Sequence, residues 1–172
     1  MEIIRYIVLI AIMSCSTSIG FLLSKRYADR LNELSDLYVL INILQNKIKF
    51  TQLPLIETFE QIGNISVKTG VKNIFLKCST ELKNNKLEDS WKDVIKQEKV
   101  FLNLKNEDIE TIITLGNILG KSDVEGQMNE INEFKERLSI QIKQAEEEKR
   151  KNAKMFKSLG TVIGLVIVII LF

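Results

Sequence analysis

The sequence predicts an all-α protein, a bundle of about six helices in which two long antiparallel helices extend into transmembrane helices at the two ends of the chain. Three observations support this prediction. Apolar stretches occupy both ends, the only proline is Pro54, and apolar residues recur at helical spacing through most of the chain between them. A membrane-anchored helical protein is therefore the expected class.

The first long helix is expected to begin within the membrane and to end near Phe50. The segment from Ile3 to Leu23 is apolar apart from Arg5 and a short run of small polar residues. A helix of about 20 residues crosses the hydrocarbon layer of a bilayer, so this segment is long enough. Beyond it, apolar residues alternate at steps of three and four, which predicts a seam packed along another helix: Leu34, Leu37, Ile41, Leu44 and Ile48.

The second long helix is expected to begin at a tight turn and to continue into the apolar segment from Ser158 to Phe172. Gly120 stands where a left-handed C-cap glycine belongs, and Ser122 with Glu125 has the spacing of an N-terminal capping box. This helix also carries a 3.5-residue seam, made of Val124, Met128, Ile131, Phe134, Leu138, Ile142 and Ala145. Because both long helices are rooted in the same membrane, we expect them to pack antiparallel.

Shorter helices are expected between the two long ones. Pro54 suits the first turn of one of them, because proline has no N–H that needs a partner there. Ser90 and Trp91 are expected to begin another, and Asn106 to cap a third. Trp91 is interpreted as part of the edge of the core, with a partner anchor as the alternative.

Basic residues flank each apolar segment on the side that faces the middle of the chain. Such flanks stay in the cytoplasm, so residues 25–157 are expected to form a cytoplasmic helical domain. Residues 1–24 and 158–172 are then the two transmembrane helices, with both termini outside. The flanking residues are Lys25, Arg26 and Arg30 after the first segment, and Lys149, Arg150, Lys151, Lys154 and Lys157 before the second.

The two cysteines, Cys15 and Cys78, are expected to be buried free thiols rather than a disulfide, because one lies in an apolar run and the other in an amphipathic one. The residues from Ile12 to Cys15 also resemble a lipoprotein cleavage box, so cleavage at Cys15 is an alternative. Apolar sequence continues past this cysteine to Leu23, whereas a cleaved signal normally gives way to polar sequence.

Small residues recur at four-residue spacing in both apolar segments, as Ser16 with Gly20 and as Gly160 with Gly164. Such pairs let helices approach closely in lipid, so the two spans are expected to pack with each other or with a partner. The alternative interpretation is that glycine and serine are simply frequent in membrane helices.

The composition argues against catalysis and ligand binding. The sequence has no histidine, which removes the commonest general base and metal ligand. Its 24 basic and 22 acidic residues leave a net charge of +2, without the clustered surplus that nucleic-acid binding requires. No glycine-rich phosphate loop is present. We therefore expect no catalytic residues, metal, cofactor or nucleic-acid partner.

Four short motifs accompany the two spans and the charged last helix. They are Lys25-Arg26, the segment Thr51-x-Leu53-Pro54-Leu55-x-Glu57, Ser90-Trp91, and the turn Leu119-Gly120-Lys121-Ser122-Asp123-x-x-x-Gln127. Together they resemble the stage III sporulation protein AB family of endospore-forming bacteria. That family is similar in fold to the cytoplasmic domain of the type II secretion system F platform protein in the inner membrane.

The resemblance implies a non-enzymatic platform subunit in the mother-cell membrane that surrounds the forespore. Such a subunit would dock a secretion-type ATPase of the same sporulation operon to a channel built with other membrane subunits. The secretion platform proteins carry duplicated domains and more spans, so this chain would need self-association or further subunits. The alternative function is a membrane-tethered helical hairpin that acts as a signalling or structural adaptor.

The turn before the last helix is a candidate partner contact. Cap chemistry accounts for Gly120 and Ser122, but it explains the other polar residues of the turn less specifically. The turn is expected at the end of the domain far from the membrane, where a cytoplasmic ATPase could dock. The expected contact consists of Lys121, Asp123, Gln127, Thr51 and Glu57. Cap chemistry alone is the alternative.

Overall fold

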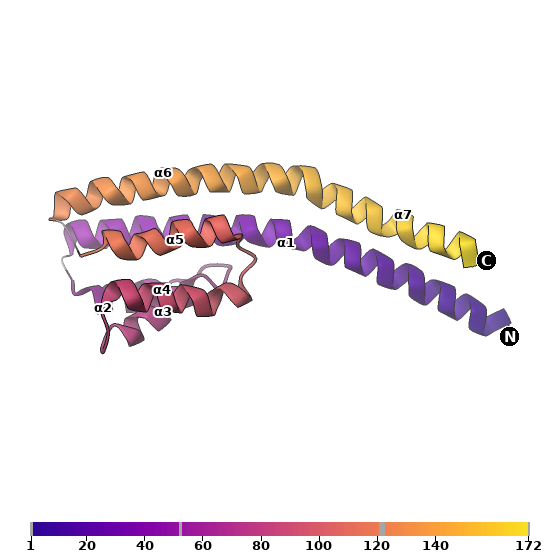
Figure 1. Cartoon of the computed structure of the whole chain (residues 1–172), viewed down its shortest axis with the longest axis horizontal. Helices are drawn as coiled ribbons and strands as arrows, with labels where there is room; N and C mark the ends of the chain where they lie inside the picture. The colour runs from indigo at the N-terminus through magenta and orange to yellow at the C-terminus, as the bar shows by residue number, and fades with distance from the viewer. Residues whose placement is uncertain (1, 52, 121–122, 172) are drawn as a thin grey trace. The chain divides into compact units, whose positions relative to one another are not determined.

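The structure is a computed structural model that describes residues 2–51, 53–120 and 123–171. Every regular element in these ranges is helical, and two long helices lie toward the two ends of the chain, which confirms the predicted fold class (Figure 1). The elements are, in chain order, α1 (Glu2–Phe50), α2 (Leu55–Gly63), α3 (Lys72–Glu81), α4 (Leu87–Glu98), the 3-10 turn η1 (Lys99–Phe101), α5 (Asn106–Ile118), α6 (Val124–Glu148), the π-helical turn η2 (Lys149–Ala153) and α7 (Lys154–Leu171).

Three of the short helices begin at a residue other than the expected one. Pro54 is the N-cap of α2 rather than part of its first turn. α4 begins at Leu87 instead of Ser90, because acidic residues in its first turn suit the helix dipole. The N-cap of α5 is Lys105 instead of Asn106, and the backbone N–H of Lys105 donates to Asp108 Oδ2 at 2.8 Å.

The chain forms two compact units. The segment Arg30–Gln144 is called the helical domain below. The anchor unit consists of the residues up to Asp29 together with those from Ala145 onward. α1 contributes residues to both units.

The helical domain is organised around the seam between α1 and α6. The Gln45 side chain marks their pairing, because it donates to Asn132 Oδ1 at 2.8 Å and accepts from Lys135 Nζ at 3.0 Å. Lys135 Nζ also lies 5.6 Å from the centroid of the Tyr38 ring, so the two helices run antiparallel. Burying each seam side chain stabilises the domain by about 1.5–3 kcal/mol. These side chains are Leu34, Leu37, Leu40, Ile41 and Leu44 from α1, and Ile131, Phe134 and Leu138 from α6.

Three aromatic rings join α2, α3 and α4 in a second part of the core. Phe59, Phe75 and Trp91 are fully buried, with ring centroids 5.4, 5.5 and 5.6 Å apart. Trp91 Nε1 donates to the carbonyl oxygen of Ile112 on α5 at 2.8 Å. Gly116 leaves room for the indole, because a Cβ atom at this position would lie 2.7 Å from Trp91 Cδ1. Trp91 therefore lies inside the core and ties four helices together.

Candidate functional site

The anchor unit presents two apolar helices whose side chains are mostly exposed. The apolar 18-residue windows near the N-terminus and near Leu171 have mean hydropathy of 2.1 and 2.0, and only 17% and 11% of them are buried. Both helices are long and apolar enough to cross a membrane. A soluble protein would bury such apolar surface, so its exposure favours a lipid environment.

Within the anchor unit, α1 and α7 approach closely where two glycines face each other. A Cβ atom on Gly20 would lie 2.6 Å from the carbonyl oxygen of Phe156 and 2.9 Å from Gly160 Cα. A Cβ atom on Gly160 would lie 2.9 Å from Gly20 Cα. All three distances are too short for a real side chain, so this backbone approach requires glycine on both helices.

Ser16 and Gly164 continue this contact along the two helices. The Ser16 hydroxyl donates to the carbonyl oxygen of Gly160 at 2.7 Å. A Cβ atom on Gly164 would lie 3.1 Å from Ser16 Cβ, a tight contact that one of the two helices would have to relieve. The two small-residue patterns of the sequence therefore face each other within one chain. In lipid, an interhelical hydrogen bond of this kind contributes about 0.6 kcal/mol on average.

Replacing Gly160 with leucine is expected to separate the two helices, because its side chain would collide with the backbone of α1. A destabilisation of about 1 kcal/mol would lower the ratio of paired to unpaired helices about fivefold. Pairing can be measured by thiol crosslinking of a Tyr27→Cys/Phe156→Cys variant in a Cys15→Ser background, since these rings stack with centroids 5.8 Å apart. The control is Val162→Leu, at an exposed position of the same helix. Equal crosslinking in both variants would contradict the expected packing.

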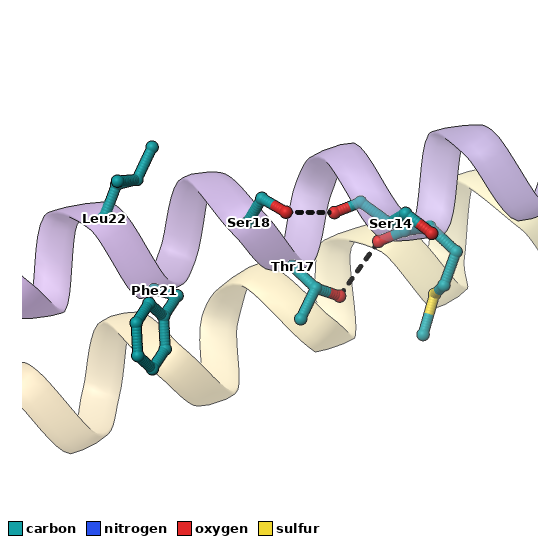
Figure 2. Close-up of a pocket in the computed structure, with 6 residues that line it drawn as sticks. Ser14, Thr17, Ser18, Phe21 and Leu22 are labelled. Carbon is teal, nitrogen blue, oxygen red and sulfur yellow. Dashed lines mark hydrogen bonds between the residues drawn. The ribbon is translucent and has the colours of Figure 1, made fainter.

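A pocket on the same part of α1 is lined by Met13, Ser14, Thr17, Ser18, Phe21 and Leu22 (Figure 2). The hydroxyl groups of Thr17 and Ser18 donate to the backbone carbonyl oxygens of Met13 and Ser14 at 2.9 and 2.8 Å. These bonds satisfy the hydroxyl protons inside the helix, as a lipid environment requires. The pocket lining therefore carries no charge, and two of its hydroxyl protons are already used within α1.

The two cysteines differ in their surroundings. Cys78 is buried as expected, and burial together with the neighbouring charge of Glu81 raises the pKa of its thiol to about 12. The thiol is therefore protonated and unreactive at neutral pH. The expectation of burial is wrong for Cys15, whose side chain is exposed. An apolar sequence in a span faces lipid, so it does not imply a protein core around the cysteine.

The last long helix contains one irregular turn that the sequence pattern did not predict. η2 (Lys149–Ala153) is π-helical and carries three of the basic residues of the second flank. A π-turn inserts one extra residue and rotates the helix that follows it. Beyond it, contacts with α1 continue through Phe156, whose ring stacks on Tyr27, and through Lys157, whose Nζ lies 5.0 Å from the centroid of the Phe21 ring.

The helical domain contains a buried ion pair that sequence reasoning missed. Arg30 is 3% exposed and Asp108 is fully buried. Arg30 Nε and Nη2 donate to Asp108 Oδ2 and Oδ1 at 2.7 and 2.9 Å, which is a bidentate arrangement. The sequence places Arg30 in the basic flank beside the membrane and assigns no role to Asp108. In the structure the two residues join α1 to α5 inside the domain.

Two further carboxylates of α1 hold connecting segments. Glu33 accepts from the backbone N–H and the side-chain amide of Asn103 at 2.7 and 3.1 Å. Asp36 Oδ2 accepts from the backbone N–H of Thr69 at 2.8 Å. Backbone N–H groups in connecting segments need such acceptors when water is excluded. The spacing of three between Arg30, Glu33 and Asp36, next to the apolar seam, is the sequence signal that could have revealed this set.

The turn before α6 has the expected glycine geometry and a different cap. Gly120 has a φ of +81°, in the left-handed region that glycine adopts without strain. The N-cap was expected to be Ser122, but Asp123 Oδ1 accepts from the backbone N–H of Gly126 at 3.0 Å and performs this role. Asp123 directly precedes α6 and satisfies the orphan N–H of Gly126, whereas the expected capping box with Glu125 depends on Ser122. Ser122 and Lys121 lie outside the described residues.

The other candidate contact residues gather at the end of the domain where α1 finishes and α6 begins. Thr51 is exposed and donates its hydroxyl proton to the carbonyl oxygen of Lys47 at 2.6 Å, while Glu57 is exposed in the first turn of α2. Gln127 is half-buried. Local bonds thus account for Thr51 and Asp123, which supports the alternative of cap chemistry for these two.

Exposed apolar side chains share this end of the domain, and the sequence analysis did not single them out. Phe50 is 73% exposed at the last position of α1, and Leu53 is also exposed. Val124, the first residue of α6, was expected in the seam but is exposed. Among the described residues, no group of three or more acidic or cysteine side chains is arranged to hold a metal ion.

Comparisons with known proteins agree on one family. The family model described as Stage III sporulation protein AB matches residues 5–172. A relative from Bacillus subtilis (strain 168), described as Stage III sporulation protein AB, is 27% identical over 162 residues, which cover 93% of this chain and 94% of the relative. A solved structure of Stage III sporulation protein AB (SpoIIIAB) has the same fold, with a TM-score of 0.67 at 22% identity over 72% of this chain and 98% of the solved chain. Because the family model covers nearly the whole sequence, this chain belongs to the stage III sporulation protein AB family and is a sporulation protein.

Proposed function

We propose that this chain is a non-enzymatic platform subunit, anchored in the mother-cell membrane, that docks a cytoplasmic secretion-type ATPase to a sporulation-specific channel. The observation that carries the proposal is the exposed apolar surface at the far end of the helical domain. This surface, called the tip below, consists of Phe50, Leu53 and Val124. The ends of α1 and α6 at the tip are opposite to the ends that continue into the apolar helices.

The tip has the composition of a protein contact. Large apolar side chains at its centre would bury against a partner, and aromatic residues such as Phe50 commonly dominate such interfaces. Exposed or half-buried polar residues lie close to them in the sequence, at positions Thr51, Glu57, Asp123 and Gln127. These are the candidate contact residues of the sequence analysis, together with Lys121. They would form the rim of the contact rather than its centre.

The orientation of the chain is part of the same proposal. Basic residues on the inner side of each apolar helix favour a cytoplasmic helical domain and two termini outside the cytoplasm. In that orientation the tip faces the compartment that holds an ATPase. Other channel subunits, or further copies of this chain, would complete the platform around it.

The test is binding of the sporulation ATPase to the full-length chain in nanodiscs. A Phe50→Ala/Val124→Ala variant is expected to weaken binding more than about tenfold, because truncating central apolar residues removes most of the affinity of an interface. The matched control is Val39→Ala/Ile140→Ala, which removes exposed apolar side chains elsewhere on the same domain. Sporulation frequency should fall only in the tip variant. Binding that is the same in both variants would rule out the tip as the docking surface.

The second candidate function is a signalling or structural adaptor. It is favoured by the continuity of α1, a single helix of 49 residues with no break between its apolar and its polar part. An adaptor would act through the helix seams and would need no ATPase. Failure of the wild-type chain to bind the ATPase would favour this function over docking.

A further inference from the structure

The turn η1 (Lys99–Phe101) exposes two adjacent large apolar side chains. Val100 and Phe101 are each 76% exposed, more than any tip residue. The turn follows directly from α4, whose apolar side is buried through Val94 and Ile95. Two neighbouring large apolar residues that are this exposed mark a candidate contact surface.

The position of η1 in the domain indicates the kind of surface it meets. Asn103, two residues after Phe101, is held by Glu33 of α1, and Asp108 at the start of α5 is held by Arg30. η1 therefore lies at the end of the domain where α1 enters it, opposite to the tip (Figure 1). Measured along α1, about 13 Å of helix separate Glu33 from Ser24, at 1.5 Å per residue. The headgroup layer beyond the hydrocarbon is itself about 5–7 Å thick.

The charges around η1 are basic on the exposed side. Lys96 and Lys99 are exposed next to the two apolar residues. The acidic residue between them, Glu98, is buried and accepts a hydrogen bond from Lys77 on α3. The exposed surface of this segment thus combines an aliphatic residue, an aromatic residue and two lysines. That combination is typical of protein segments that lie in the headgroup region of an anionic membrane.

We propose that η1 is a third membrane contact of this chain, in which Val100 and Phe101 insert into the headgroup region while Lys96 and Lys99 meet anionic lipids. The contact would hold the near end of the helical domain against the bilayer. It is independent of ATPase docking, which involves the opposite end of the domain.

The test uses the full-length chain in nanodiscs, with no ATPase present. An environment-sensitive fluorophore is attached to Phe101→Cys in a Cys15→Ser background, where the buried Cys78 does not react. Lipids with a nitroxide near the headgroup should quench this fluorophore several-fold more than one attached to Phe50→Cys. Phe50 is a matched control because it is also an exposed phenylalanine, and about 39 Å of helix separate it from Ser24.

Lipid charge provides the second arm of the test. Quenching at residue 101 should be stronger in discs that contain phosphatidylglycerol than in pure phosphatidylcholine, and Lys96→Gln/Lys99→Gln should remove this difference. Equal quenching at residues 101 and 50 would overturn the proposal. Crosslinking between two copies through residue 101, without quenching, would also overturn it and would assign the surface to a second copy of the chain.

Discussion

Replacing Asp108 with alanine is expected to destabilise the helical domain by about 3–5 kcal/mol, because Arg30 would remain buried with its main counter-charge removed. The same change deprives the Lys105 backbone N–H of its acceptor at the start of α5. Unfolding by urea can be followed in detergent micelles through the fluorescence of Trp91, the only tryptophan in the sequence and a fully buried one.

The neighbouring Glu107 is the control for this prediction. It also contacts Arg30, at 3.4 Å, but its side chain is 56% exposed. An exposed ion pair contributes less than about 1 kcal/mol, so Glu107→Ala should change the unfolding free energy little. An Arg30→Met/Asp108→Leu variant should recover much of the lost stability, since apolar residues of similar volume can replace a buried pair. If Asp108→Ala is no more destabilised than Glu107→Ala, the buried pair does not hold α5 to α1.

Replacing Trp91 with alanine is expected to cost about 3–5 kcal/mol, because it leaves a large cavity between α2, α3, α4 and α5. Phe59 and Phe75 would each lose a ring contact. The loss of stability can be measured by thermal unfolding followed by circular dichroism. This measurement does not depend on the fluorescence of the tryptophan that the substitution removes. Trp91→Phe keeps an aromatic ring and should cost clearly less. Equal destabilisation by the two substitutions would contradict the importance of the ring cluster and would assign the effect to the hydrogen bond with Ile112.

The long helices were predictable because their stability depends on a local periodic pattern. Leu34, Leu37 and Ile41 repeat at steps that keep one face apolar, and that face is buried whatever its exact partner is. The ion pair between Arg30 and Asp108 was not predictable in this way. The two residues are far apart in the sequence, and each has a simpler local interpretation as a flanking charge or a first-turn acid.

The candidate sites also include some that the sequence predicted and some that it did not. The four-residue spacings of Ser16 with Gly20 and of Gly160 with Gly164 indicated close helix packing. Only the structure places Gly20 against Gly160. η2 escaped prediction because one inserted residue lies within the normal scatter of a pattern of steps of three and four. Val100 and Phe101 escaped because two apolar residues in a short turn carry no periodic signal.

The contact between Gly20 and Gly160 has a consequence for how copies of this chain can assemble. Because each apolar helix already uses its small-residue surface within its own chain, each copy would enter a larger membrane complex as a preformed hairpin. The unit from which such a complex is built would then be a hairpin of two helices rather than a single helix. Neighbouring subunits would meet branched aliphatic side chains such as Ile10 and Val166, which discriminate poorly between another protein and lipid tails. In such a complex, selective recognition between subunits would come from surfaces outside the bilayer.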